Sequence, residues 1–203
     1  MQSTLSLHFP LILASNSPRR REILSQAGFD FSVVASEVDE SFPADMSLQE
    51  VPVFLSEKKA RVLAEINPHA IILAADTVVI LENKILNKPA DKSEAREMLQ
   101  FLSGKTHEVI TGITLITPNE TISIADSASV SFRLLVDWEV DWYVKGGFGL
   151  DKAGAYGVQD FIGMAGIEKI NGSFYTVMGL PIFHVFNLLK PYILDGKQAQ
   201  IQF

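Results

Sequence analysis

Two arginines stand where a helix is expected to begin, and that placement indicates an anionic partner. Arg19 and Arg20 follow Ser17 and Pro18, a pair typical of a helix start. Free backbone N–H groups and the positive dipole end bind anions there, and the dipole disfavours cations by up to about 1 kcal/mol. Two cations against that preference favour an anion-binding role. A capped surface helix with solvated arginines is the alternative interpretation.

Carboxylates are concentrated at two further places. Asp76 lies between the apolar runs 70–75 and 78–81. A carboxylate at the edge of a buried strand is costly unless it is paired, hydrogen-bonded or bound to metal. Glu37 and Glu40 belong to the acidic loop 36–40, where a divalent cation would relieve their repulsion, and oxygen ligands suit Mg²⁺ or Mn²⁺. A satisfied turn aspartate and a solvated acidic loop are the alternatives.

Lysines on separate segments complete a set of groups suited to phosphate chemistry. Lys59 follows Lys58, Lys88 precedes a proline, and the glycine-rich segment 151–159 ends at Gln159. Each lysine alone is typical of a surface, and the amide of Gln159 offers a donor and an acceptor to a base edge. Together these side chains favour phosphoryl transfer from a nucleotide, in which catalysis is mostly positioning and charge neutralisation. They do not say which phosphate is attacked.

Apolar runs and helical patterns alternate along the whole chain, which predicts an α/β or α+β protein. Ser47 and Glu50 have capping-box spacing for the second helix, although Pro52 allows its first turn to lie a few residues later. Asn171 and Gly172 predict a hairpin. The predicted strands are 11–14, 70–75, 78–81, 84–86, 107–116, 121–135, 165–170 and 173–177, and the predicted helices are 18–27, 47–66, 91–103, 137–146 and one from 181.

Composition excludes several classes of protein. The 203 residues contain no cysteine, which excludes disulfides, cysteine-bound metals and a thiol nucleophile. The net charge of -7 argues against a general nucleic-acid binder. The length and the 47% of hydrophobic residues predict one domain over residues 1–203, with a polar tail from about 193.

The chain also lacks the pattern of a secretory signal or a membrane span. The basic run 19–21 follows the first apolar stretch, whereas a secretory signal has its positive charges first. The uncharged stretch 170–189 is long enough to span a membrane, but polar residues and Pro181 interrupt it. We therefore expect a cytoplasmic protein that does not enter a membrane.

In its motifs the chain resembles the Maf family of nucleoside triphosphate pyrophosphatases over about residues 9 to 192. The resemblance implies an α/β fold with a long mixed twisted sheet and flanking helices. Two lobes would enclose a cleft, as in the inosine-triphosphate-pyrophosphatase architecture. The segments that carry the resemblance are LILASNSPRRREIL (11–24), SEVDE (36–40), EKKA (57–60), AADTVV (74–79), NKP (87–89), LSGKTHEVITG (102–112), DKAGAYGVQ (151–159) and GSFYTVMGLP (172–181).

The activity that the resemblance implies is metal-dependent hydrolysis of a nucleoside triphosphate to the monophosphate and pyrophosphate. Asp76 falls on the proton acceptor, and Mg²⁺ or Mn²⁺ would be held by Glu37 with Glu40 or Asp76. Whether Asp76 is the base or a metal ligand stays open. Lys59 is favoured over Lys58 because it directly precedes Ala60. The implied catalytic residues are Asp76, Glu37, Lys59 and Lys88, and the implied substrate-binding and specificity residues are Ser17, Arg19, Arg20, Thr77 and Gln159.

Three of these positions resemble the branch of the family that prefers dTTP and UTP. Arg19, Thr77 and Gln159 match that branch, whereas the 7-methyl-GTP branch differs at all three places. A homodimer is implied by the resemblance alone. The alternatives are a nucleotide-binding regulator of septum formation, which would lack Glu37 or Asp76, and a nucleotidyltransferase. The latter normally has a glycine-rich loop after the first strand, and this chain has none there.

Overall fold

A seven-stranded mixed sheet forms the centre of the computed structural model, which describes residues 4–194. Its order is β2-β1-β3-β5-β6-β7, with β4 paired to β3. β1 pairs in parallel with β2 and β3, and the remaining pairs are antiparallel. The strands are β1 (Leu11–Ala14), β2 (Ser32–Val34), β3 (Ile71–Leu81), β4 (Lys84–Leu86), β5 (Thr106–Ile116), β6 (Thr121–Phe132) and β7 (Ile167–Asn171).

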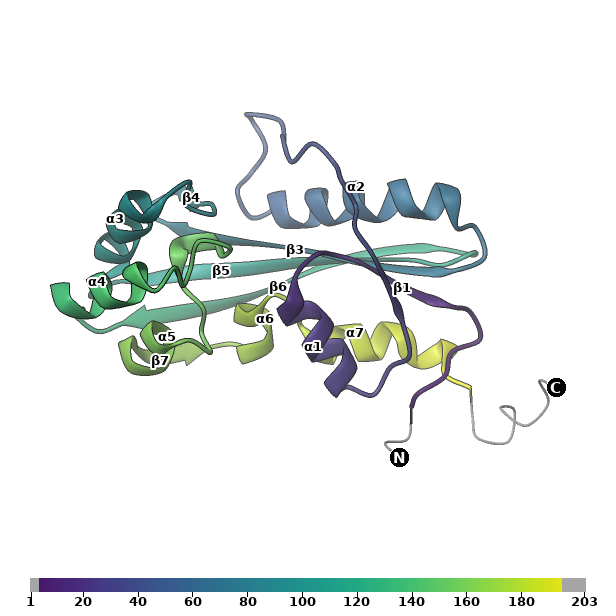
Figure 1. Cartoon of the computed structure of the whole chain (residues 1–203). Helices are drawn as coiled ribbons and strands as arrows, with labels where there is room; N and C mark the ends of the chain where they lie inside the picture. The colour runs from purple at the N-terminus through teal and green to yellow at the C-terminus, as the bar shows by residue number, and fades with distance from the viewer. Residues whose placement is uncertain (1–3, 195–203) are drawn as a thin grey trace.

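Helices cover both faces of this sheet, which confirms the predicted mixed α/β fold (Figure 1). The long strands β3, β5 and β6 run along the length of the molecule. α2 lies over one face, and α1 and α7 lie under the other, while α3, α4 and α5 gather at the far end. The helices are α1 (Pro18–Gln26), α2 (Val51–Ile66), α3 (Lys92–Leu102), α4 (Asp137–Lys145), α5 (Phe161–Gly166), α6 (Phe174–Met178) and α7 (Ile182–Leu189), with short 3-10 turns η1 (Ala153–Ala155) and η2 (Lys190–Tyr192).

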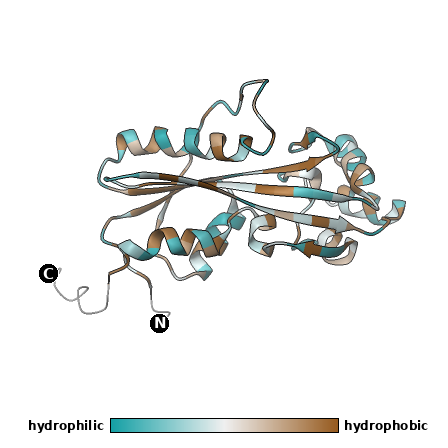
Figure 2. Ribbon diagram, turned by 180° about the vertical axis from the view of Figure 1, so that it is seen from behind, coloured by the Kyte–Doolittle hydropathy of each residue, from teal (hydrophilic) through white to brown (hydrophobic). Residues whose placement is uncertain are grey.

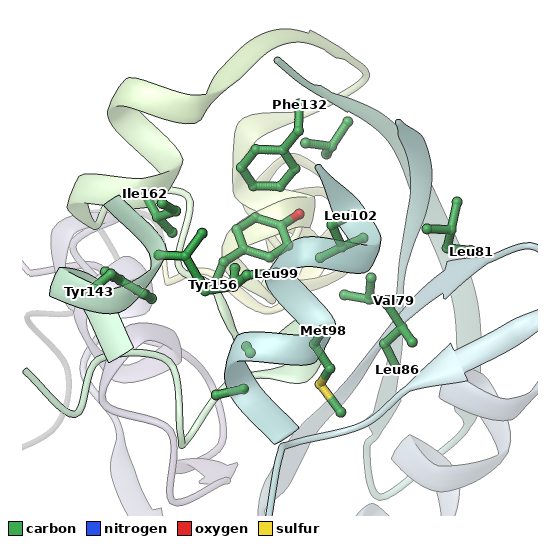
Figure 3. Packing of buried hydrophobic residues seen from close by; sticks show 14 of the residues in the cluster. Val79, Leu81, Leu86, Met98, Leu99, Leu102, Phe132, Tyr143, Tyr156 and Ile162 are labelled. Carbon is green, nitrogen blue, oxygen red and sulfur yellow. The ribbon is translucent and has the colours of Figure 1, made fainter. Parts of the chain in front are cut away.

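β3 is the central strand of the core. Ten of its eleven residues are buried because helices cover it on both faces, and this explains its nearly continuous apolar sequence. Figure 2 shows the hydrophobic colouring concentrated along the strands between the helices. A second apolar cluster lies at the end of the molecule near α3. There Tyr156 packs beside Leu99, Leu102 and Phe132 (Figure 3).

Local sequence rules predicted several elements correctly. β1 has the predicted bounds, and α1 begins at Pro18 after Ser17, whose side chain accepts a hydrogen bond from the backbone N–H of Arg20. The hairpin from β3 to β4 is confirmed, and its turn residues Glu82 and Asn83 have φ values of 50° and 60°. The predicted runs 70–75 and 78–81 are one strand, because β3 continues through Asp76 without a break.

α2 begins at Val51, a few residues after Ser47, as expected from Pro52 in its first turn, and Glu50 caps it without a side-chain hydrogen bond. One other prediction was wrong. The predicted strand 173–177 is helix α6, so no hairpin forms at Asn171 and Gly172. Ser173 caps that helix by accepting a hydrogen bond from the backbone N–H of Tyr175. The preceding residues 161–166 form α5, and only Ile167–Asn171 is a strand.

Between residues 4 and 194, no helix combines the length and the apolar character that crossing a membrane requires. Most of the predicted polar tail, residues 195–203, lies outside the described part of the chain.

His107 on β5 is buried as a neutral base, and we expect it to make stability depend on pH. Its side chain hydrogen-bonds the Tyr156 hydroxyl at 2.7 Å and stacks on Phe132. Burial lowers the pKa of His107 to about 4. As the pH falls from about 6.5 to 4, the imidazole is protonated in the unfolded chain but stays neutral in the folded chain. Lowering the pH through this range should therefore reduce the free energy of unfolding by roughly 3 kcal/mol.

Urea denaturation at pH 7 and pH 4.5 measures this effect. In His107→Gln the drop in unfolding free energy between the two pH values should be smaller than in the unchanged protein. His69→Gln, at an exposed histidine, is the matched control and should leave the drop as it was. Parallel pH profiles for the unchanged protein and His107→Gln would contradict the assignment of the effect to His107.

Candidate active site

The candidate site lies where the free edge of β3 is left open. β1 pairs with β3 only as far as Ala74, and β4 begins to pair at Val79. Asp76 and Thr77 lie in the gap between these two neighbours. A cavity of about 400 Å³ opens there, and a second of about 240 Å³ shares several of its lining residues. The predicted residues that line the larger cavity are Ser17, Arg19, Arg20, Glu40, Lys59, Asp76, Thr77, Lys88 and Gln159.

Asp76 faces α2, and its partner there is Lys59. The Lys59 ammonium lies 2.5 Å from Oδ1 of Asp76 and 2.8 Å from Oε1 of Glu40. The side chains of Lys59 and Asp76 are only 11% and 12% exposed, so this pair is screened little by water. Partial burial raises the pKa of Glu40, but the hydrogen bond and charge of Lys59 outweigh it and the pKa is lowered. The result is one cation held between two carboxylates at the cavity wall.

The guanidinium of Arg20 forms its hydrogen bonds with other groups of the protein. It donates to the carbonyls of Gly179 and Ala75, both at 2.7 Å, and to the Thr77 hydroxyl at 3.1 Å. Burial lowers the pKa of Arg20, although nearby Asp76 works in the opposite direction. Arg20 thus ties α1 to β3 and to the segment between α6 and α7, with few donors left for a ligand.

Arg19 reaches across the cavity to the segment after α4. Its guanidinium is 2.8 Å from Asp151, whose other carboxylate oxygen is 2.7 Å from the Lys152 ammonium. Partial burial alone would raise the pKa of Asp151, but the hydrogen bonds from Lys152 and Arg19 lower it to about 2. An anionic ligand that binds Arg19 would have to compete with Asp151.

Gln159 lines the larger cavity. Its Oε1 atom is buried and has no hydrogen-bond partner in the described residues. A buried unpaired amide oxygen is costly, so it is the kind of group that a ligand N–H donor satisfies. Lys88 lines both cavities, and its charge helps to lower the pKa of Glu40.

Not all of the predicted residues meet. Glu37 is exposed and lines neither cavity. Lys58 donates to the carbonyls of Asp39 and Ser41, so its neighbour Lys59 is the lysine that reaches the cavity. Among residues 4–194, no group of three or more histidine, aspartate or glutamate side chains is placed to hold a metal ion.

Sequence reasoning singled out neither Asp151 nor Thr111. Asp151 meets Arg19 across 132 positions of sequence, and no local pattern signals such a pair. Thr111 lies beside Thr77 with its hydroxyl 2.9 Å away, on a strand that also carries the polar residues His107 and Thr114. Its neighbours in sequence therefore gave no signal that distinguishes it.

The fold and the cavity together define a mixed α/β protein with a cleft lined by lysine, arginine and carboxylate side chains. A model of the Maf-like protein family matches residues 10–192, and the chain belongs to that family. A relative from Bacillus anthracis, named dTTP/UTP pyrophosphatase, is 44% identical over 189 residues, which is 93% of this chain and 98% of that protein. A relative of the same name from Bacteroides thetaiotaomicron is 45% identical over 184 residues, 90% of this chain and 95% of that protein.

A solved structure was also found by its fold. It is described as a nucleoside-triphosphatase / dITP/XTP pyrophosphatase from Mycobacterium abscessus, and it matches with a TM-score of 0.41 and 16% identity. The match covers 61% of this chain and 74% of that one.

Proposed function

We propose that this protein hydrolyses dTTP and UTP to the nucleoside monophosphate and pyrophosphate, as a single cytoplasmic domain. The observation that carries the proposal is the cavity at the gap beside β3, which brings Asp76, Lys59, Arg19 and Gln159 to one place. The name shared by the family relatives supports the substrate class. The unpaired acceptor of Gln159, a residue that lines the cavity, suits the N3–H of a thymine or uracil imide.

In the proposed reaction, water attacks the α-phosphorus and Asp76 accepts the proton that the water loses. The bond between the α-phosphorus and the bridging oxygen breaks, and pyrophosphate leaves with that oxygen. Lys59 holds Oδ1 of Asp76. In this proposal its other oxygen, Oδ2, accepts the proton of the attacking water. Arg19, Lys59 and Lys88 lie where they would neutralise charge on the triphosphate.

The carboxylates of Glu40 and Asp76 could hold a divalent cation together with the phosphates of the substrate. Mg²⁺ is commonly bound by one or two carboxylates together with substrate phosphates. Glu40 and Asp76 supply two carboxylates, and both contact the Lys59 ammonium, so a bound cation would share these carboxylates with Lys59. Such a cation would supply Lewis-acid polarisation of phosphate oxygens when bound. Glu37, which lines neither cavity, would need the loop 36–40 to rearrange before it joined the set.

A panel of nucleoside triphosphates tests the proposal. The protein is incubated with dTTP, UTP, CTP, GTP and ATP in Mg²⁺ or Mn²⁺, and the products are resolved by ion-exchange chromatography. We expect monophosphate and pyrophosphate from dTTP and UTP, and no turnover after the metal is chelated. Diphosphate with orthophosphate would contradict attack at the α-phosphorus. Binding without product would contradict the enzymatic proposal and favour a nucleotide-binding regulator.

A further inference from the structure

Thr111 is a fully buried hydroxyl that lies directly behind the cavity wall. It pairs with Thr77 in the register of β5 and β3, so the two side chains lie side by side on the same face of the sheet. Their hydroxyl oxygens are 2.9 Å apart, and the Thr111 hydroxyl is also 2.8 Å from the carbonyl oxygen of Thr176 in α6. Thr77 lines the cavity, whereas Thr111 does not.

The direction of these hydrogen bonds follows from which groups have a proton to give. A carbonyl oxygen only accepts, so the single proton of Thr111 goes to Thr176. In the bond between the two threonines, Thr111 must then accept and Thr77 must donate. The proton of Thr77 is therefore directed away from the cavity.

Arg20 also donates a hydrogen bond to the Thr77 hydroxyl, which uses one of its lone pairs. Its guanidinium only donates, and it gives one hydrogen bond to the Thr77 oxygen at 3.1 Å. A threonine hydroxyl has one proton and two lone pairs. With the proton and one lone pair in use, Thr77 has only an acceptor left for a ligand. The buried Oε1 of Gln159, a residue that lines the same cavity, is an acceptor as well.

We propose that Thr111 is a positioning residue for base recognition, because it holds the Thr77 hydroxyl as an acceptor and so favours bases with a ring N–H. The inference rests on the proposed function for its substrate class. Uracil and thymine carry a hydrogen on N3, which satisfies an acceptor. Cytosine has a lone pair on N3, which would face the lone pairs of the cavity wall. The chain Thr176–Thr111–Thr77 thus sets a preference for UTP over CTP.

Thr111→Val tests this step, because valine keeps the volume of threonine and removes the acceptor. The Thr77 proton is then free to turn toward the cavity and serve N3 of cytosine. We expect the ratio of kcat/KM for UTP to that for CTP to fall about three- to tenfold, the effect of one hydrogen bond. The change should be in KM more than in kcat, because the reacting phosphate is not involved. Calorimetric titration with UMP and CMP measures the same preference without turnover.

Two further variants separate this role from a structural one. Thr111→Ser keeps the hydroxyl and should keep the nucleotide preference. Thr114→Val removes another fully buried hydroxyl of β5, one that contacts Ser56 and Ser123 away from the cavity, and should leave both ratios unchanged. If Thr111→Val does not fold, Thr111→Cys puts a weak sulfur acceptor at the same place and should shift the ratios in the same direction.

The outcomes distinguish this inference from the proposed function. Unchanged UTP:CTP and UMP:CMP ratios in a folded Thr111→Val or Thr111→Cys overturn the inference, while the hydrolysis stands. Equal binding of UMP and CMP by the unchanged protein also overturns it. If the protein hydrolyses no triphosphate, the proposed activity fails. A fall of the UMP:CMP binding ratio in Thr111→Val would still support the role of Thr111.

Discussion

Asp76→Asn should lower kcat for pyrophosphate release from dTTP by about 10²- to 10⁴-fold, the range typical for loss of a general base. Asparagine has nearly the shape of aspartate but accepts no proton from the attacking water. KM should change little, because Arg19, Lys88 and Gln159 remain in the cavity. The initial rate of pyrophosphate release from dTTP, measured with a coupled assay over a range of substrate concentrations, separates the two constants.

The folded state of this variant can be checked independently. Asp76→Asn leaves the Lys59 ammonium with Glu40, 2.8 Å away, so the charge is not left without a partner. We therefore expect a lowered melting temperature but a cooperative transition by circular dichroism. Asp141→Asn makes the same chemical change at an exposed residue of α4 that pairs with Arg96, and it should keep full activity. A kcat within tenfold of the unchanged protein would remove Asp76 from the role of proton acceptor.

The elements that could be predicted are those whose bounds depend on residues adjacent in sequence. Ser17 and Pro18 placed the start of α1 because a cap and its helix are adjacent in the chain. The prediction of a strand at 173–177 was wrong, although local signals for a helix are present there. The segment is rich in aromatic and β-branched residues, but Ser173 caps it as a helix and Gly179, at φ 99°, ends it.

The site itself depends on contacts that no local pattern carries. Asp76 was read as an interruption between two strands, because a carboxylate in an apolar run is costly without a partner. The partner, Lys59, is on α2, and with that ion pair β3 continues unbroken. Motif resemblance could propose Lys59 and Asp76 as site residues. The pairing of Arg19 with Asp151, and the use of Arg20 within the protein, follow only from the folded structure.

Gly112 on β5 is the point where α2 rests directly on the sheet, and Gly112→Ala should be strongly destabilising. A Cβ atom there would lie 2.3 Å from the carbonyl carbon of Pro52 and 2.4 Å from the backbone nitrogen of Val53. These are backbone atoms of the first turn of α2, so no side-chain rotation relieves the clash. Overpacking usually costs about 1–3 kcal/mol, and we expect about 3 kcal/mol or more, measured as the loss of unfolding free energy in urea.

The same clash should also reduce activity in the fraction that stays folded. Gly112 pairs with Asp76 in the register of β5 and β3, and α2 carries Lys59. Lifting the start of α2 off the sheet would draw the Lys59 ammonium away from Asp76 and lower kcat for dTTP. Gly147→Ala, where a Cβ would meet nothing within 4 Å, is the matched control. It should cost only the strain of φ 77°, about 1–2 kcal/mol, and keep kcat. If Gly112→Ala loses no more unfolding free energy than Gly147→Ala, α2 yields at Gly112 at little cost. If Gly112→Ala keeps the kcat of the unchanged protein, the contact of α2 with β5 does not position Lys59.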